Sequence, residues 1–102
     1  MTHVVVAAMS MSSYVPGDLV RLSAAFTVGS VATDPTTVTC VVRAPDGTET
    51  TYATPTKDGV GNYHVDHDLT AAKGGVYAQR WIGTGACQAA MESEFFVEPS
   101  VF

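Results

Sequence analysis

Histidine and aspartate alternate along one short stretch of the chain, and this spacing raises the question of a metal site. The stretch reads His64-Val65-Asp66-His67-Asp68. On a strand, His64, Asp66 and Asp68 lie along one face at steps of about 6.6 Å, because each residue rises about 3.3 Å. Three side chains in a straight row do not converge on one tetrahedral centre, although two neighbours could share an ion. We therefore expect no metal and no cofactor, and interpret the row as a solvated polar face that discourages association between sheet edges.

The residues needed for catalysis form no recognisable set. The sequence has neither a glycine-rich phosphate loop nor a nucleophile elbow. Cys87 could serve as a nucleophile only if the fold placed both a base and an orienting group beside it. The ten Asp and Glu residues are spread over positions that the pattern exposes, so no acid–base pair stands out. We expect that the chain is not an enzyme.

The overall composition narrows the classes of partner. The chain has 102 residues, 46% of them hydrophobic, and a formal net charge of −5, which together indicate one packed domain. Its five Lys and Arg residues are scattered, so we expect neither a nucleic-acid nor a membrane partner. The apolar run at residues 4–9 is too short for a membrane span or a secretory signal, and we expect the protein to fold in the cytoplasm.

Alternation of apolar and polar residues predicts strands throughout. Residues 19–28 place Val20, Leu22, Ala24, Phe26 and Val28 on one face, the pattern of a strand with one buried side. The Asp-Gly pair at residues 46–47 predicts a tight hairpin. The other strands are expected at residues 37–43, 49–54, 62–69, 76–82 and 87–98, with 55–61 as a loop. No helical periodicity appears, so the sequence predicts an all-β sandwich.

Three aromatic residues are expected inside this sandwich. Tyr63 and Tyr77 each follow closely after a glycine at a strand start, as tyrosine corners do. Trp81 shares a face with Tyr77, and we interpret it as a core residue rather than a platform for sugars. Cys40 and Cys87 are interpreted as buried thiols, which suits cytoplasmic folding, although the sequence also permits one disulfide.

Two regions favour contacts with other subunits. Residues 1–13 form an apolar arm whose Val4, Val5 and Val6 could pair as a strand, either within the subunit or on a neighbour. Phe96 falls on the face that otherwise holds Glu92, Glu94 and Glu98, and Val101 and Phe102 follow in a short tail at residues 99–102. We predict interface use for these six apolar residues: Val4, Val5, Val6, Phe96, Val101 and Phe102.

Several short motifs carry a resemblance. They are Tyr14-Val15-Pro16-Gly17-Asp18, Val20-Arg21-Leu22, Asp34-Pro35-Thr36-Thr37-Val38, Arg43-Ala44-Pro45-Asp46-Gly47-Thr48, Gly61-Asn62-Tyr63 and Arg80-Trp81-Ile82-Gly83-Thr84-Gly85. The set, covering about residues 14–98, resembles small immunoglobulin-like virion structural proteins of tailed bacteriophages. The resemblance implies an immunoglobulin-like antiparallel β-sandwich of about seven strands with an extended N-terminal arm.

The resemblance also implies a role in a virus particle. We expect a capsid decoration protein that binds the head lattice through its arm and an exposed face, where many weak copies gain by avidity. Its partners would be the major capsid protein or other virion proteins, and it would be present as a homo-oligomer or as lattice-bound copies. The alternatives are a neck or tail accessory protein, or a carbohydrate- or cell-surface-binding module of the same fold.

Overall fold

The computed structural model describes residues 4–7, 13–69 and 74–99. Within these ranges the chain forms strands and no helix. The strands are β1 (Val4–Ala7), β2 (Ser13–Tyr14), β3 (Leu19–Val28), β4 (Val31–Ala32), β5 (Thr37–Arg43), β6 (Glu49–Tyr52), β7 (Thr56–Gly59), β8 (Asn62–Asp68), β9 (Gly75–Thr84) and β10 (Ala89–Val97). The predicted all-β class is confirmed.

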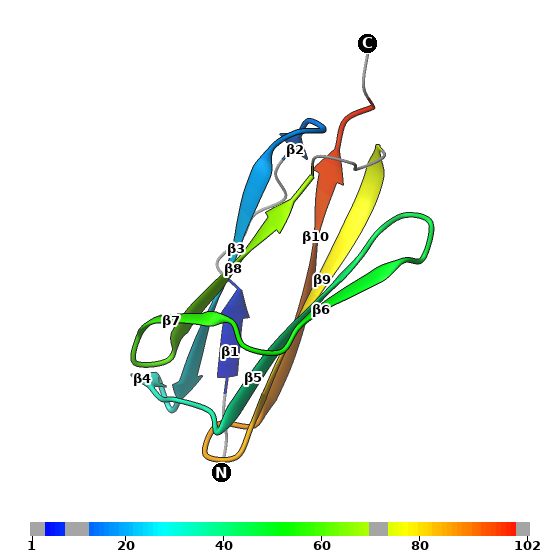
Figure 1. The fold of residues 1–102 in the computed structure, drawn as a ribbon. Coiled ribbons are helices and arrows are strands. Elements are labelled where there is room, and N and C mark those ends of the chain that lie inside the picture. Colours follow the sequence, from blue (N-terminus) through cyan, green and yellow to red (C-terminus); the bar gives the residue numbers. More distant parts are fainter. Residues whose placement is uncertain (1–3, 8–12, 70–73, 100–102) are drawn as a thin grey trace.

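The strands form two sheets that pack face to face as a sandwich (Figure 1). The first sheet has the order β1-β3-β8-β7, with the two-residue β4 beside β3. The second has the order β2-β10-β9-β5-β6. All pairs are antiparallel except β2 with β10. Apart from the two-residue strands, this arrangement matches the A-B-E-D and G-F-C sheets of immunoglobulin domains, with β6 added beside the C strand.

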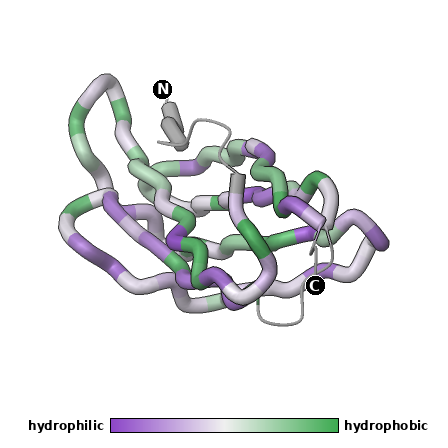
Figure 2. The backbone as a smooth tube through the Cα atoms, turned by 90° about the horizontal axis from the view of Figure 1, so that it is seen from above, coloured by the Kyte–Doolittle hydropathy of each residue, from purple (hydrophilic) through white to green (hydrophobic). Residues whose placement is uncertain are grey.

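Alternation along the strands produces the core. In β3 and β5 every second side chain is buried, as predicted, and the hydropathy colours alternate along the chain in Figure 2. The predicted β5–β6 hairpin forms, with Arg43 opposite Glu49. The largest fully buried hydrophobic side chains come from both sheets: Trp81, Phe26, Phe95, Leu22 and Leu69. Burial of these side chains is the main stabilising contribution to such a fold.

The sequence-based boundaries differ from the structure in three places. The segment expected as a loop at residues 55–61 contains β7, which pairs with β8, so that prediction is wrong. Strand β6 ends at Tyr52 rather than at residue 54. The last strand begins at Ala89, which leaves Cys87 in the preceding loop.

Part of the expected N-terminal arm belongs to the sandwich. Strand β1 pairs antiparallel with β3 of the same chain, with Val5 opposite Phe26. Ser13 and Tyr14 then pair with β10 of the other sheet. The N-terminal segment therefore contributes to both sheets. The tail residues Val101 and Phe102 lie outside the described residues, as do the rest of the arm and residues 70–73.

Candidate interaction surface

The histidine and aspartate row on β8 is a structural network on the outer side of the first sheet. His64 is buried, with 9% of its surface exposed, and its Nδ1 lies 2.7 Å from Oδ2 of Asp58 on β7. Asp66 forms an ion pair with Arg21 of β3 at 2.9 Å. The hydrogen bond from Arg21 keeps the pKa of Asp66 below its ordinary value. The interpretation of the whole row as solvated is therefore wrong for His64, because β7 covers it.

A second network centres on Asp34, in the loop between β4 and β5. Its Oδ2 lies 2.7 Å from Nζ of Lys57, and its Oδ1 accepts hydrogen bonds from the N–H of Gly61 at 2.8 Å and the hydroxyl of Tyr63 at 3.3 Å. The Lys57 and Gly61 donors lower the pKa of the Asp34 carboxyl. The Tyr63 ring packs edge-on against Phe26, so the predicted placement of a core ring with its hydroxyl bonded to a loop is confirmed. This carboxylate fastens the loop to β7 and β8.

The two sheets are also linked by a polar contact. The hydroxyl of Tyr52 on β6 lies 2.6 Å from Nδ1 of His67 on β8, and the two rings meet edge to face. Burial lowers the pKa of His67, with Asp68 acting in the opposite direction. Burial also raises the pKa of Tyr52. The neutral imidazole is therefore the form that the folded protein favours.

This contact predicts that stability falls in mild acid. A His whose pKa is lower in the folded state than its unfolded value near 6.5 binds fewer protons when folded. Its contribution is complete above about pH 6.5 and decreases as the pH falls toward the folded pKa. Urea unfolding followed at intervals from pH 7.5 to 5 should show this loss. A His67→Gln variant, which keeps a hydrogen-bonding side chain but does not titrate, should show a smaller loss, and an identical pH profile would contradict the assignment.

The remaining candidates for chemistry are inside the sandwich. Cys40 and Cys87 are both buried free thiols. Burial raises the pKa of Cys40 to about 12 and raises that of Cys87 as well, so both favour the neutral form, which is a poor nucleophile. Trp81 has no exposed surface and donates from Nε1 to Oε1 of the buried Gln79 at 2.9 Å. The prediction of a core tryptophan is confirmed.

The outer side of the second sheet combines apolar side chains with charge. Phe96 on β10 lies opposite Val76 on β9, and Val76 is 47% exposed. Two steps along the strands, Glu94 lies opposite Ala78, and two further steps along, Glu92 lies opposite Arg80. We call this side of β10, β9, β5 and β6 the outer face. The predicted placement of Phe96 on the face that holds the glutamates is confirmed, and Phe95 is buried on the opposite side of the strand.

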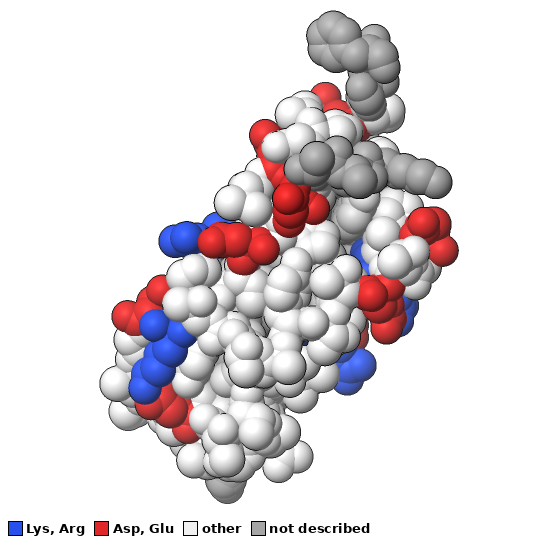
Figure 3. Space-filling model, in the orientation of Figure 1, with Lys and Arg blue, Asp and Glu red and all other residues white. Residues whose placement is uncertain are grey.

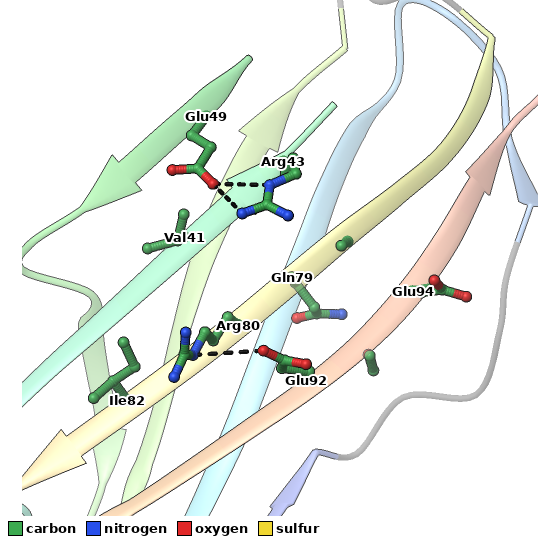
Figure 4. A pocket seen from close by; sticks show the side chains of 10 residues that line it. Val41, Arg43, Glu49, Gln79, Arg80, Ile82, Glu92 and Glu94 are labelled. Carbon is green, nitrogen blue, oxygen red and sulfur yellow. Dashed lines mark hydrogen bonds and ion pairs between the residues drawn. The ribbon is translucent and has the colours of Figure 1, made fainter. Parts of the chain in front are cut away.

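The outer face is hollowed across four strands (Figure 4). The hollow has a volume of about 740 Å³, and its lining includes two ion pairs, Arg43 with Glu49 at 2.8 Å and Arg80 with Glu92 at 3.6 Å. Side chains that line it from the outer face include Val41, Arg43, Glu49, Ala78, Arg80, Ile82, Glu92 and Glu94. Its lining combines short apolar side chains with paired charged ones.

Charge elsewhere on the molecule is mixed. Figure 3 shows basic and acidic side chains next to each other on the visible face, with no large area of one sign. Within the described ranges, no group of three or more His, Cys, Asp or Glu is placed to hold a metal ion. No helix in the described part of the chain is long and apolar enough to cross a membrane.

Sequence reasoning missed most of the hollow. It identified Glu92 and Glu94 of β10 but not Val41, Arg43, Arg80 or Glu49, because the pairing of β5 with β9, which are far apart in the chain, brings these residues to one place. The alternation in β5 and β9 did place Val41 and Arg80 on the outer side of their strands, which was the available signal. The predicted interface residues Val4, Val5 and Val6 pair through their backbones with β3 and do not belong to the outer face.

Fold and surface together define a class: a small immunoglobulin-like β-sandwich with a hollowed, mixed-charge outer face. Comparison with known proteins adds no closer assignment, since no family model and no curated protein sequence matches the chain.

Proposed function

We propose that this protein is a non-enzymatic structural component of a bacteriophage particle, a capsid decoration protein that binds the head lattice. The virion is its place of action, after folding in the host cytoplasm. The major capsid protein or another virion protein is the partner, and neither nucleic acid nor membrane is involved. The resemblance of residues 14–98 to phage immunoglobulin-like proteins supplies this setting.

The composition of the outer face is the observation that best supports a role in binding another protein. It places the exposed Val76 and the partly exposed Phe96 at one end of a hollow that spans β10, β9, β5 and β6. An apolar anchor beside a polar rim is the usual composition of a protein interface. Because a capsid repeats one site many times, even a weak contact of this kind can give high occupancy when copies are linked.

The state of the titratable groups supports a non-enzymatic role. His64 is bonded to Asp58, His67 to Tyr52, and Asp34 to Lys57. These groups hold strands and loops together. Because each of these titratable groups has a structural role, binding of other proteins is better supported than catalysis.

The structure bears differently on the two alternatives, a carbohydrate-binding module and a neck or tail protein. A carbohydrate-binding module needs an exposed aromatic platform, whereas Trp81 is buried, Tyr52 is bonded to His67, and Tyr14 packs edge-on against Phe95. Phe96, the remaining aromatic candidate, is partly exposed and lies opposite Val76 on the outer face, so it is the one ring that this alternative could use. A neck or tail protein would use the same outer face, and the copy number separates it from a decoration protein.

Quantitative mass spectrometry of purified particles of the source phage tests the proposal. About one copy per major capsid subunit, or a simple lattice fraction, is the expected result. A few copies per particle would move the protein to the neck or tail. Complete absence from the particles would overturn the proposal.

The outer face makes a more specific prediction. Val76→Glu should reduce the number of copies bound per particle by about tenfold, equivalent to about 1.4 kcal/mol, by placing a charge in the apolar contact. The matched control is Val60→Glu, which makes the same change at a valine that is 55% exposed, in the turn between β7 and β8. Circular dichroism should show both variants folded. Equal occupancy by the two variants would remove the outer face from the interface.

A further inference from the structure

Strand β6 is the last strand of the second sheet on the side away from β10. It pairs with β5 along one side, and among the described residues no strand pairs with its other side. Its residues Glu49, Thr50 and Thr51 are all exposed, and Figure 1 shows the β5–β6 hairpin at the margin of the molecule. An edge strand with unpaired N–H and C=O groups is a template for pairing with another chain.

The backbone groups on this edge of β6 can be assigned. The N–H of Ala44 donates to the carbonyl of Thr48 at 2.8 Å, so these two residues form a hydrogen-bonded pair of the hairpin. The register of β5 with β6 is unbroken beyond that pair. Because alternate residues turn their N–H and C=O groups to opposite sides, those of Thr50 face β5, and those of Glu49 and Thr51 face outward.

A second copy of the chain can use all of these groups in one register. With Thr50 of the two copies side by side, Glu49 of each copy lies opposite Thr51 of the other, and each such pair exchanges two backbone hydrogen bonds. A register centred on Glu49 would place two carboxylates directly opposite each other, which is unfavourable. A register centred on Thr51 would leave Glu49 beyond the partner's strand, because β6 ends at Tyr52.

The side chains of β6 suit the register centred on Thr50. Glu49 is paired with Arg43 of its own chain at 2.8 Å, so its charge is compensated where it meets Thr51 of the other copy. Threonine side chains opposite each other stabilise neighbouring strands, and threonine and tyrosine favour strands. Strand β6 has no proline, no lysine and no bulge, which are features that usually protect an edge from pairing.

The corresponding edge of the first sheet does carry such protection. Strand β7 shifts its register against β8 between Lys57 and Gly59. Its charged side chains are already used within the chain, since Lys57 pairs with Asp34 and Asp58 with His64. A bulge and charged side chains both discourage the addition of a strand, so β6 is the edge that is suited to pairing.

We propose that two copies of this chain associate by antiparallel pairing of β6 about Thr50, so that their second sheets form one continuous sheet. The two-fold axis is perpendicular to this sheet, which places the outer faces of both copies on the same side. The hollow, whose lining reaches Glu49 on β6, then lies beside the hollow of the second copy. This association goes beyond the proposed function and does not depend on it, although linked outer faces gain by avidity on any repeated partner.

Cysteine cross-linking tests the register. Thr50→Cys places two thiols at the axis, in a pair whose Cα atoms lie about 4.5 Å apart, which is within the range for a disulfide. The matched control is Thr48→Cys, at an exposed threonine of the same edge, whose two copies lie about 13 Å apart in this register. Under mild oxidation Thr50→Cys should form covalent dimers at least about tenfold faster than the control. Cys40 and Cys87 are buried and should not contribute.

A second pair of variants tests the backbone contact. Thr51→Pro removes an N–H that points to the second copy, and an edge strand tolerates proline in that orientation. In sedimentation velocity at millimolar concentration it should be monomeric, whereas Thr51→Val keeps the N–H and should associate as the unmodified protein does. Circular dichroism should show that both variants are folded.

Three outcomes would each overturn the pairing through β6. They are equal cross-linking of the two cysteine variants, equal association of the two Thr51 variants, and an unmodified protein that is monomeric at millimolar concentration. If particles carry the protein but the chain does not pair through β6, the pairing fails and the proposed function stands. If the chain pairs through β6 but is absent from the particles, the particle role fails and the dimer remains.

Discussion

Replacing Trp81 by alanine is expected to destabilise the protein by about 3–5 kcal/mol, the usual cost of removing a large aromatic side chain from a core. Trp81 has no exposed surface, and its strand β9 lies between β10 and β5 in the second sheet. Its loss would leave a cavity in the core and take away the donor to Oε1 of Gln79. Since domains of this size are stable by only about 5–15 kcal/mol, urea unfolding followed by circular dichroism should show a large decrease in the midpoint.

A second replacement separates volume from hydrogen bonding. Trp81→Phe retains most of the apolar contact and should cost clearly less than the alanine variant, although the amide of Gln79 then loses its only described hydrogen bond. In the unmodified protein the single tryptophan should emit at short wavelength and resist quenching by acrylamide. Accessible fluorescence, or equal stability of the alanine variant, would contradict a buried Trp81.

Gly61→Ala is expected to cost about 3 kcal/mol or more, because the position combines two restrictions. Its φ is +74°, in the region that favours glycine. A Cβ there would lie 2.5 Å from the carbonyl oxygen of Phe26 and 3.0 Å from the nitrogen of Thr33. These two atoms are joined by a 3.0 Å hydrogen bond, so the added methyl group would force apart the junction of β3, β8 and the loop after β4.

Gly47 provides the matched control for this prediction. It also has a positive φ, +91°, but nothing lies within 4 Å of the position where a Cβ would be. Gly47→Ala should therefore cost only the conformational strain, about 1–2 kcal/mol. The difference between the two variants measures the steric clash, and equal unfolding free energies would show that the approach to Phe26 is not restrictive.

Alternation of apolar and polar residues predicts a strand only where that strand buries one of its faces. Strands β3 and β5 bury one face each, so Val20, Leu22 and Cys40 mark those strands without knowledge of their neighbours. Strand β7, with the sequence Thr-Lys-Asp-Gly, has no apolar side chain. Nothing in it distinguishes a strand from a loop, because its pairing with β8 depends on backbone hydrogen bonds and on contacts such as that between Lys57 and Asp34.

His64 shows the same limit for a single side chain. Alternation correctly placed it on the outer side of β8, and an outer position on a sheet is usually solvated. Its burial results from β7 at the edge of the same sheet, where Asp58 bonds to the imidazole. A pattern within β8 holds no information about that neighbour.

The sequence by itself determined the all-β class, the principal strands, the β5–β6 hairpin and the core position of Trp81. These properties depend on the local order of apolar, polar and turn residues. Only the tertiary structure decided that Asp34 joins three segments and that the outer face is hollowed. These features depend on strand order and register, which bring together residues such as Arg43 and Glu94 that are distant in the chain.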